Sequence, residues 1–286
     1  MAVPIILARY SEIGLKSTPV RVRFENRLRD NIINMLAADR VEALVTKRDS
    51  RFFIEAENID AASASLKRVF GIASFSVAET CSSEMEDICS VSAEYSMSRL
   101  KEGESFAVKA RREGNHKYTS IDVGREAGSA IFLANEYKGV KVNLTNPDVV
   151  FFVEVRNNKA FIFGSSVKCH AGLPIGTQGK VLAEVRSDRD VISAWLMMKR
   201  GCKVIINGER QPLLERYDPE LKYGDELSSE ISGIVSGATL EDIESISVSE
   251  FDVPIYFPTI GMSDTEVNSL LETIKIETAP SAKTGQ

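Results

Sequence analysis

The chain has 286 residues, 43% of them hydrophobic and 27% charged, with a net charge of −6. This balance excludes an intrinsically disordered chain, and the length suits two or three domains, each with its own core. No apolar run reaches the roughly 18 residues that span a bilayer. Residues 1–14 combine an apolar run with no basic segment and no small-residue cleavage site, so we expect a first strand and a cytoplasmic protein.

The charge is distributed unevenly along the chain. Residues 1–170 contain 24 basic and 22 acidic side chains, whereas residues 171–286 contain 11 basic and 19 acidic ones. A polyanion such as RNA therefore suits the first part, and a basic protein partner suits the acidic second part.

Cysteine and histidine are too sparse for several classes of active site. The only histidines are His116 and His170, which excludes a multi-histidine metal site and disfavours a histidine-based triad. No two cysteines form a C-x-x-C pair, so we expect reduced thiols without a catalytic or metal-binding role at Cys81, Cys89, Cys169 and Cys202.

The first 80 residues predict a ferredoxin-like domain. Strands are expected at 4–9, 44–47, 51–55 and 72–78, with helices from Thr18-Pro19 and over 61–69, the second capped by Asp60. The order βαββαβ defines the ferredoxin-like unit. The first helix has one apolar face and one basic face, which is a candidate phosphate-binding stripe unless Glu25 and Asp30 neutralise it. The basic face consists of Arg21, Arg23, Arg27 and Arg29.

A second α/β unit follows. A Ser83–Glu86 capping box predicts a helix to about residue 100, and a long helix is expected over 120–137. Strands are expected at 106–110 and 140–142 and as a hairpin at 149–155 and 160–165. The first of these strands leads into basic residues beside an aromatic one, which could contact RNA phosphates and stack on a base, or form a solvated face. These residues are Lys109, Arg111, Arg112, Lys117 and Tyr118.

The last third predicts a small, mostly parallel, Rossmann-like sheet after a glycine-rich segment at 172–179. Strands are expected at 181–185, 204–206, 231–235 and 253–257, with helices at 191–199, after Thr239 and after Ser263. The final residues 279–286 suit a disordered tail.

Several stretches together resemble one family. They are RYSEIGLKS with RFENRLRDNI, FAVKARREGNHKYTS, VNLTNPDVVFFVEVRNNKAFIF, and GLPIGTQGKV with WLMMKRGCKV. They are similar to the tRNA 4-thiouridine synthetases, or tRNA sulfurtransferases (ThiI). The resemblance implies a ferredoxin-like domain at 1–80, a THUMP RNA-binding domain at 81–167, a linker at 168–180 and an adenylating domain at 181–278.

In that family the first two domains grip the acceptor end of tRNA. The third binds ATP through an SGG-x-DS loop and adenylates a uridine carbonyl, and a persulfide donor and a cysteine complete sulfur transfer. Here the loop falls on Arg186, Ser187, Asp188, Arg189 and Asp190, where only Asp190 matches and both glycines are gone. Asp188 would face the phosphates at a cost of about 1–4 kcal/mol at ~4 Å. We therefore expect Asp190 to be a helix cap or a surface residue rather than a Mg²⁺ ligand, and the loop to be a vestige.

These observations predict a tRNA-binding accessory protein that has lost ATP-dependent adenylation and has no cofactor, metal or membrane contact. Its partners would be the tRNA acceptor region and a separate modifying enzyme, with a homodimer left open. Further RNA contacts are expected from Lys16, Arg21, Arg23, Lys168 and Lys180. Two alternatives remain. One is an active tRNA sulfurtransferase with an atypical site for ATP and Mg²⁺, and the other is a protein-interaction module without RNA binding.

Overall fold

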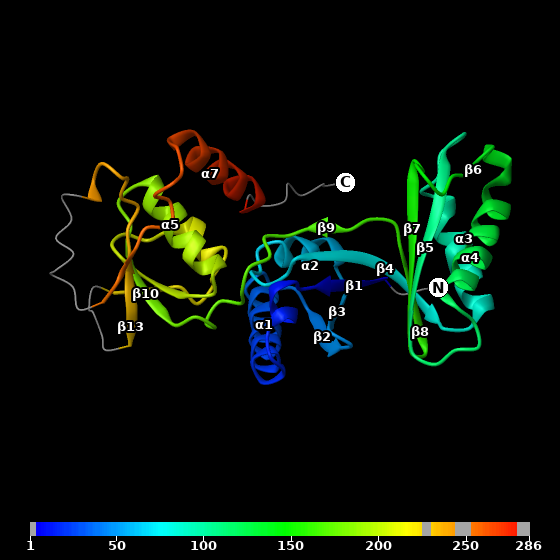
Figure 1. The fold of residues 1–286 in the computed structure, drawn as a ribbon, viewed down its shortest axis with the longest axis horizontal. Coiled ribbons are helices and arrows are strands. Elements are labelled where there is room, and N and C mark those ends of the chain that lie inside the picture. Colours follow the sequence, from blue (N-terminus) through cyan, green and yellow to red (C-terminus); the bar gives the residue numbers. More distant parts are fainter. Residues whose placement is uncertain (1–3, 225–229, 244–252, 279–286) are drawn as a thin grey trace. The chain divides into compact units, whose positions relative to one another are not determined.

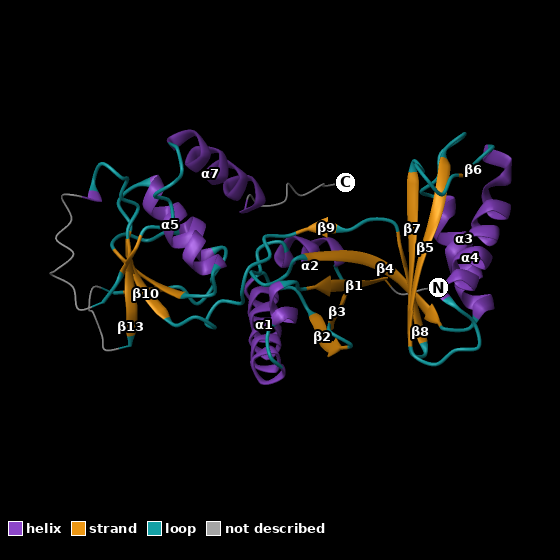
Figure 2. Cartoon of the chain, viewed as in Figure 1, coloured by secondary structure: helices purple, strands orange, loops and turns teal. Residues whose placement is uncertain are grey.

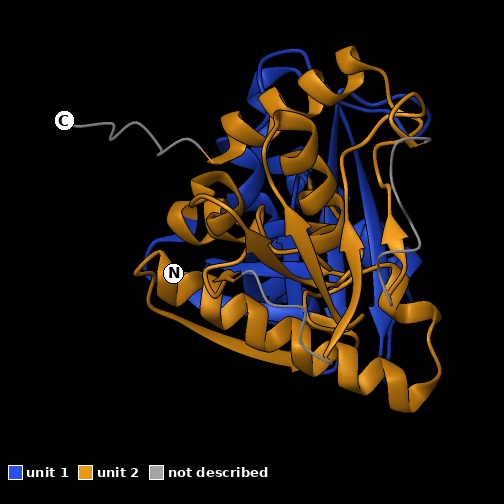
Figure 3. Cartoon of the chain, turned by 90° about the vertical axis from the view of Figure 1, so that its left-hand side faces the viewer, with its two compact units in different colours: residues 1–8, 52–59, 75–167 blue, residues 9–51, 60–74, 168–286 orange. Residues whose placement is uncertain are grey.

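The computed structural model describes residues 4–224, 230–243 and 253–278. The chain divides into two compact units (Figure 3). Unit 1 comprises residues 1–8, 52–59 and 75–167, and unit 2 comprises residues 9–51, 60–74 and 168–286. The predicted order βαββαβ at the start of the chain is confirmed, because the elements run β1, α1, β2, β3, α2, β4.

Unit 1 is built on one sheet. Its strands are β1 (Pro4–Arg9), β3 (Arg51–Ala56), β4 (Ser74–Ser82), β5 (Ser105–Glu113), β6 (Lys141–Val142), β7 (Val149–Arg156) and β8 (Lys159–Phe163). They lie in the order β3-β1-β4-β8-β7-β5-β6. Strand β5 runs parallel to both β6 and β7, while β7 and β8 form the predicted antiparallel hairpin.

Two helices, α3 (Met85–Met97) and α4 (Ser120–Asn135), pack side by side on one face of this sheet (Figure 1). Helix α4 buries Val123, Ala127 and Ile131, which recur at helical spacing and contact the sheet core. A 3-10 turn at Glu136–Lys138 ends this segment.

The first part of unit 2 contains the helices of the ferredoxin-like region. They are a 3-10 turn at Glu12–Leu15, α1 (Thr18–Ala38) and α2 (Ile59–Leu66), with strand β2 (Ala43–Arg48) between the two α-helices and β9 (Val167–Lys168) at the unit boundary. Helix α1 buries Phe24, Leu28, Ile32 and Leu36, as their spacing predicts.

The second part of unit 2 is a parallel α/β layer, in which helices and strands alternate (Figure 2). Its strands are β10 (Lys180–Glu184), β11 (Lys203–Asn207), β12 (Lys222–Tyr223), β13 (Ile231–Val235) and β14 (Ile255–Tyr256). Its helices are α5 (Asp188–Lys199), α6 (Pro212–Glu215) and α7 (Asp264–Thr278). The strand order is β12-β11-β10-β13-β14 and every pair is parallel, so the predicted parallel sheet is confirmed.

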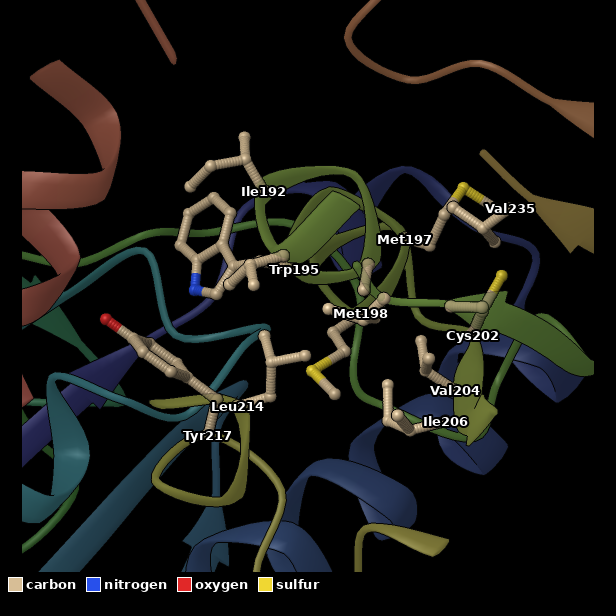
Figure 4. Close-up of a cluster of buried hydrophobic side chains, with 14 of the residues drawn as sticks. Ile192, Trp195, Met197, Met198, Cys202, Val204, Ile206, Leu214, Tyr217 and Val235 are labelled. Atoms are coloured by element: carbon tan, nitrogen blue, oxygen red, sulfur yellow. The ribbon is translucent and has the colours of Figure 1, made fainter. Parts of the chain in front are cut away.

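The core of unit 2 combines residues that lie far apart in the sequence. The Phe70 ring stacks on Tyr217 at 5.3 Å and meets Trp195 edge-on at 5.1 Å. Trp195 and Tyr217 also meet edge to face at 5.7 Å, within a cluster of buried apolar side chains (Figure 4). A residue from the ferredoxin-like region therefore completes the core of the parallel α/β layer.

The glycine-rich segment before β10 is held against the end of α5. The carbonyl oxygen of Gly201 accepts hydrogen bonds from three successive backbone N–H groups, those of Gly176, Thr177 and Gln178, at 2.9, 3.0 and 3.0 Å. Gly201 has φ +95°, and a Cβ there would lie 2.5 Å from Thr177 Oγ1, so this position requires glycine.

Some predicted boundaries and caps are wrong. Strand β5 continues to Glu113, because Arg111 and Arg112 stay in register with β7. Helix α5 starts at Asp188 rather than Val191. Helices α1 and α3 have Ser17 and Glu84 at their N-caps, without side-chain cap bonds, so Thr18 and Ser83 are not caps.

Asp60 is also no cap, because it lies inside the first turn of α2. The predicted tail at 279–286 falls outside the described residues, as does most of the helix expected after Thr239. None of the described helices has both the length and the apolar character needed to span a membrane.

Candidate nucleic-acid interface

The basic cluster of unit 1 lies on strand β5, which separates its members onto two faces. Neighbouring residues of a strand point to opposite sides of the sheet. Val108 and Ala110 point toward α4, since the ideal Cβ of Gly128 lies 3.8 Å from Val108 and that of Gly124 lies 3.9 Å from Ala110. Arg112 therefore shares the helix-side face, whereas Lys109 and Arg111 share the opposite one.

Arg112 belongs to a set of contacts that holds the loop after β5. Its Nη1 donates to the Gly114 carbonyl at 2.7 Å, and His116 Nε2 lies 2.5 Å from the Asn157 carbonyl. The Tyr118 ring stacks on His116 at 5.1 Å, and its hydroxyl donates to the Ser83 carbonyl. Burial raises the pKa of Tyr118. One face of this ring is thus already occupied by His116.

Lys109, Arg111 and Lys117 are exposed, and the described residues contain no ion pair to any of them. Across the sheet, Arg111 lies opposite Glu154, a carboxylate only 6% exposed that accepts from Arg156 Nε at 3.3 Å. The sequence reasoning missed Glu154 and Arg156, although their alternation with the apolar residues of the hairpin was visible.

The basic residues at the start of unit 2 are only partly neutralised. Arg29 pairs with Asp30 at 3.0 Å, but Glu25 accepts from Lys47 at 3.1 Å instead of from an α1 arginine. Of the other predicted contacts, Lys16, Arg23, Arg27 and Lys168 are exposed and Arg21 is half-buried. Lys180 forms an ion pair with Glu230.

The turn after β10 is closed by Asp190. Ser187 and Asp190 form a capping box, in which Asp190 Oδ2 accepts from the N–H groups of Arg186 and Ser187 at 3.2 and 3.0 Å. The other oxygen, Oδ1, accepts from the Gly237 N–H at 2.9 Å. Of the two roles expected for Asp190, the capping role is confirmed, with Asp190 as the third helical residue of a box whose N-cap is Ser187. Backbone N–H groups that could cradle a phosphate are occupied by this carboxylate.

The two arginines of the turn, Arg186 and Arg189, also have partners within unit 2. Arg189 donates to the Thr259 and Met262 carbonyls at 2.9 and 3.1 Å and pairs with Asp264 at 2.6 Å. Arg186 pairs with Glu184. The ideal Cβ of Gly237 would lie 2.5 Å from Asp190 Oδ1, so the loop after β13 packs directly on the turn. These contacts engage Arg186, Arg189 and Asp190 within unit 2.

The thiols are poorly suited to nucleophilic chemistry. Burial raises the pKa of Cys81 to about 12 and that of Cys169 to about 12, and it also raises the pKa of Cys89 and Cys202. Thiols with raised pKa values contain little thiolate at neutral pH. Within the described ranges, no group of three His, Cys, Asp or Glu side chains could hold a metal ion.

Two family models match the part of the chain that contains the predicted RNA contacts on α1 and β5. A family model described as the ThiI ferredoxin-like domain matches residues 5–76, and one described as the THUMP domain matches residues 82–164. The chain is therefore a THUMP-domain protein. Because its THUMP domain follows a ThiI ferredoxin-like domain, it belongs with the ThiI-like proteins, which confirms the resemblance drawn from the sequence.

Relatives named probable tRNA sulfurtransferase include one from Methanosarcina acetivorans, 41% identical over 204 residues, covering 70% of this chain and 49% of the relative. Another, from Methanocaldococcus jannaschii, is 34% identical over 239 residues, covering 76% of this chain and 62% of the relative. The chain thus spans between about half and three fifths of the length of these relatives.

Two crystal structures resemble the chain along nearly its whole length. PH1313 from Pyrococcus horikoshii is 26% identical with a TM-score of 0.81, over 96% of this chain and 100% of PH1313. A 4-thiouridine synthetase in complex with RNA and ATP is 23% identical with a TM-score of 0.77, over 98% of this chain and 87% of that one. The second likeness supports the fold alone.

Proposed function

We propose that the protein binds the acceptor region of tRNA and acts as a recognition factor in tRNA modification, without adenylating its substrate. The observation that carries the proposal is the pairing of a THUMP domain with a ThiI ferredoxin-like domain in relatives named probable tRNA sulfurtransferase. Exposed cations on β5 supply the phosphate contacts, since phosphate binding dominates the affinity of such interfaces.

Lys109, Arg111 and Lys117 form the primary contact set in this proposal. They are exposed and have no ion pair within the described part of the chain, so binding RNA breaks no internal salt bridge. Arg112 and Tyr118 would support the loop rather than bind first, because Gly114 and His116 already hold them. Lys16, Arg21, Arg23 and Lys168 are secondary contacts, and Lys180 contributes least because Glu230 pairs with it.

The loss of adenylation is supported by the turn after β10. A phosphate loop offers backbone N–H groups to the anion, but here Asp190 accepts those of Arg186, Ser187 and Gly237. The protein would therefore depend on a separate enzyme for the chemical step, with ATP and Mg²⁺ bound elsewhere.

Two binding measurements test the proposal. Fluorescence anisotropy with unmodified tRNA should give an affinity that falls steeply between about 50 and 200 mM salt. The triple variant K109A/R111A/K117A should weaken binding by about 100-fold and reduce the salt slope by about three. As a control, the removal of two cations in unit 2, R186A/R210A, should leave the affinity unchanged.

Calorimetry with ATP and Mg²⁺ tests the second part. No heat of binding is expected at about 1 mM nucleotide, a threshold that corresponds to a free energy of about −4 kcal/mol. Micromolar, Mg²⁺-dependent binding would overturn the loss of adenylation and favour an active sulfurtransferase. Unchanged tRNA binding in the triple variant would instead overturn the assigned RNA interface.

A further inference from the structure

Unit 1 contains an apolar groove that the proposed RNA interface does not use. It has a volume of about 880 Å³ and lies between strand β5 and helix α4. Val108 and Ala110 form its floor, and Gly124 and Gly128 leave room along the helix because they lack side chains. Apolar side chains at its rim are largely exposed, with Ile121 at 79%. Exposed apolar grooves of this kind mark binding sites.

The groove opens at a strand edge whose backbone groups are available. Strand β6 pairs with β5 only at Ser105 and Phe106 among the described residues. The Phe106 carbonyl accepts from Asn143 N at 2.9 Å on this outer side, whereas the Glu113 carbonyl accepts from Asn157 N at 3.1 Å on the β7 side. Along a strand, the backbone N–H and C=O groups of successive residues point alternately toward its two neighbours. Those of Val108, Ala110 and Arg112 therefore point to the outer edge, as the Phe106 carbonyl does.

The electrostatics of the groove select its occupant. Its lining contains a single charged residue, Arg125, which pairs with Asp122 at 3.2 Å and Glu126 at 3.1 Å. A polyanion gains little from such a groove. Alternating N–H and C=O groups on an open edge instead match the backbone of another strand.

We propose that the edge of β5 from Val108 to Arg112 binds an extended acidic segment of a partner protein, which adds a strand to the sheet. Apolar side chains of that segment enter the groove beside Val108 and Ala110. Its alternate side chains lie on the opposite face beside Lys109 and Arg111, where acidic residues are favoured.

A second copy of this chain fits the edge less well. Antiparallel pairing of two β5 edges centred on Ala110 would place Lys109 of one copy opposite Arg111 of the other on the same face. Like charges directly opposite each other destabilise a sheet, so the charge pattern favours a partner with acidic residues at these positions.

The test uses a soluble, end-capped heptapeptide that alternates glutamate and valine, titrated into the full chain and followed by calorimetry. A heptapeptide that alternates lysine and valine is the charge control. The acidic peptide should bind below about 1 mM and at least about tenfold more tightly than the basic one. Hydrogen exchange should slow at the amides of Val108, Ala110 and Arg112.

Two variants locate the binding. Ala110→Pro removes an N–H that points away from β7 and so spares the β5–β7 ladder. Gly128→Leu fills the groove from the helix side, where its Cβ meets Val108 at an ordinary 3.8 Å. Each should weaken peptide binding by about tenfold or more, and Gly128→Leu, which lies on the helix and not beside Lys109 and Arg111, should leave the tRNA affinity unchanged. Gly128→Leu provides the test if Ala110→Pro does not fold.

Three outcomes would overturn the proposal. The first is no binding of the acidic peptide at about 1 mM, and the second is equal binding by wild type and Gly128→Leu. The third is a loss of tRNA affinity in Gly128→Leu with peptide binding intact, which would assign the groove to RNA. The tRNA proposal is tested separately, by the variant K109A/R111A/K117A, and none of these three outcomes overturns it.

Discussion

Strand β5 ends in a short run that contains arginines, and such a run also follows strand β10, yet the charged residues of the two runs have different partners. At the end of β5, Lys109 and Arg111 are exposed and form no ion pair within the described residues. After β10, Asp190 accepts three backbone N–H groups, and Arg189 bonds two carbonyls and a carboxylate. The same residue types are thus exposed without ion pairs in unit 1 and bonded internally in unit 2.

The largest expected effect is a loss of stability when the aromatic core of unit 2 is truncated. Phe70→Ala removes a ring that contacts Trp195 and Tyr217 in a fully buried cluster, so unfolding in urea should show a loss of about 3–5 kcal/mol. The matched exposed variant Leu15→Ala should change stability by less than about 0.5 kcal/mol. A loss below about 1 kcal/mol for Phe70→Ala would mean that Phe70 does not pack against Trp195 and Tyr217 in solution.

Single variants on β5 and in the turn after β10 should differ in their effect on tRNA affinity. Arg111→Ala should weaken tRNA binding by about tenfold, or about 1.4 kcal/mol, because it removes an exposed phosphate contact. Arg186→Ala, which removes an arginine already paired with Glu184, should leave binding unchanged in the same anisotropy assay. Comparison of Arg111→Ala with Arg112→Ala shows which face of the sheet meets RNA, and equal losses would contradict a one-faced interface.

A smaller effect is expected at the closed turn. Asp190→Ala removes a helix cap together with the bond to Gly237, so the thermal unfolding of unit 2 should register a loss of about 1–2 kcal/mol. Asp188→Ala, at an exposed position of the same turn, should be nearly neutral. If Asp190→Ala gained ATP binding while remaining folded, Asp190 would be the element that blocks a competent phosphate loop.

The smallest effect is a pH dependence centred on His170. Burial lowers the pKa of His170, although the Glu277 carboxylate 2.6 Å away acts in the opposite direction. The folded chain therefore keeps this imidazole neutral, while the unfolded chain takes up a proton near pH 6.5. Its contribution to stability is present above about pH 6.5 and is lost as the pH falls below that value.

Thermal melts between about pH 7.5 and 5 measure this dependence. The slope at the acidic end should be shallower for His170→Gln than for the wild type. A steeper slope for the variant would show that the ion pair with Glu277 outweighs burial.

The sequence was sufficient for the parts of the structure that depend on local patterns. Apolar spacing located α1, the βαββαβ order and the hairpin of β7 and β8 correctly. The resemblance added the family, and the loss of both loop glycines led to the expectation of a cap or surface role for Asp190. The end of β5 was missed because Arg111 and Arg112 lower the apolar signal, while pairing with β7 keeps them extended.

Long-range contacts were beyond the sequence. Nothing local indicates that Phe70 stacks on Tyr217, or that Gly237 donates to Asp190. The groove beside β5 was also missed, although Gly124 and Gly128 stand four residues apart in the sequence of α4. A four-residue glycine spacing predicts proximity but does not distinguish a filled contact from an open one.

The placement of Phe70 has a consequence for how such a protein can change over generations. Deletion of residues 181–278 in one step would strip Trp195 and Tyr217 from Phe70 and leave a large aromatic ring in water. Point substitutions at exposed positions of the turn after β10, such as Asp188, uncover no buried ring. The turn can therefore change one residue at a time, while the parallel α/β layer as a whole is still needed to keep Phe70 buried.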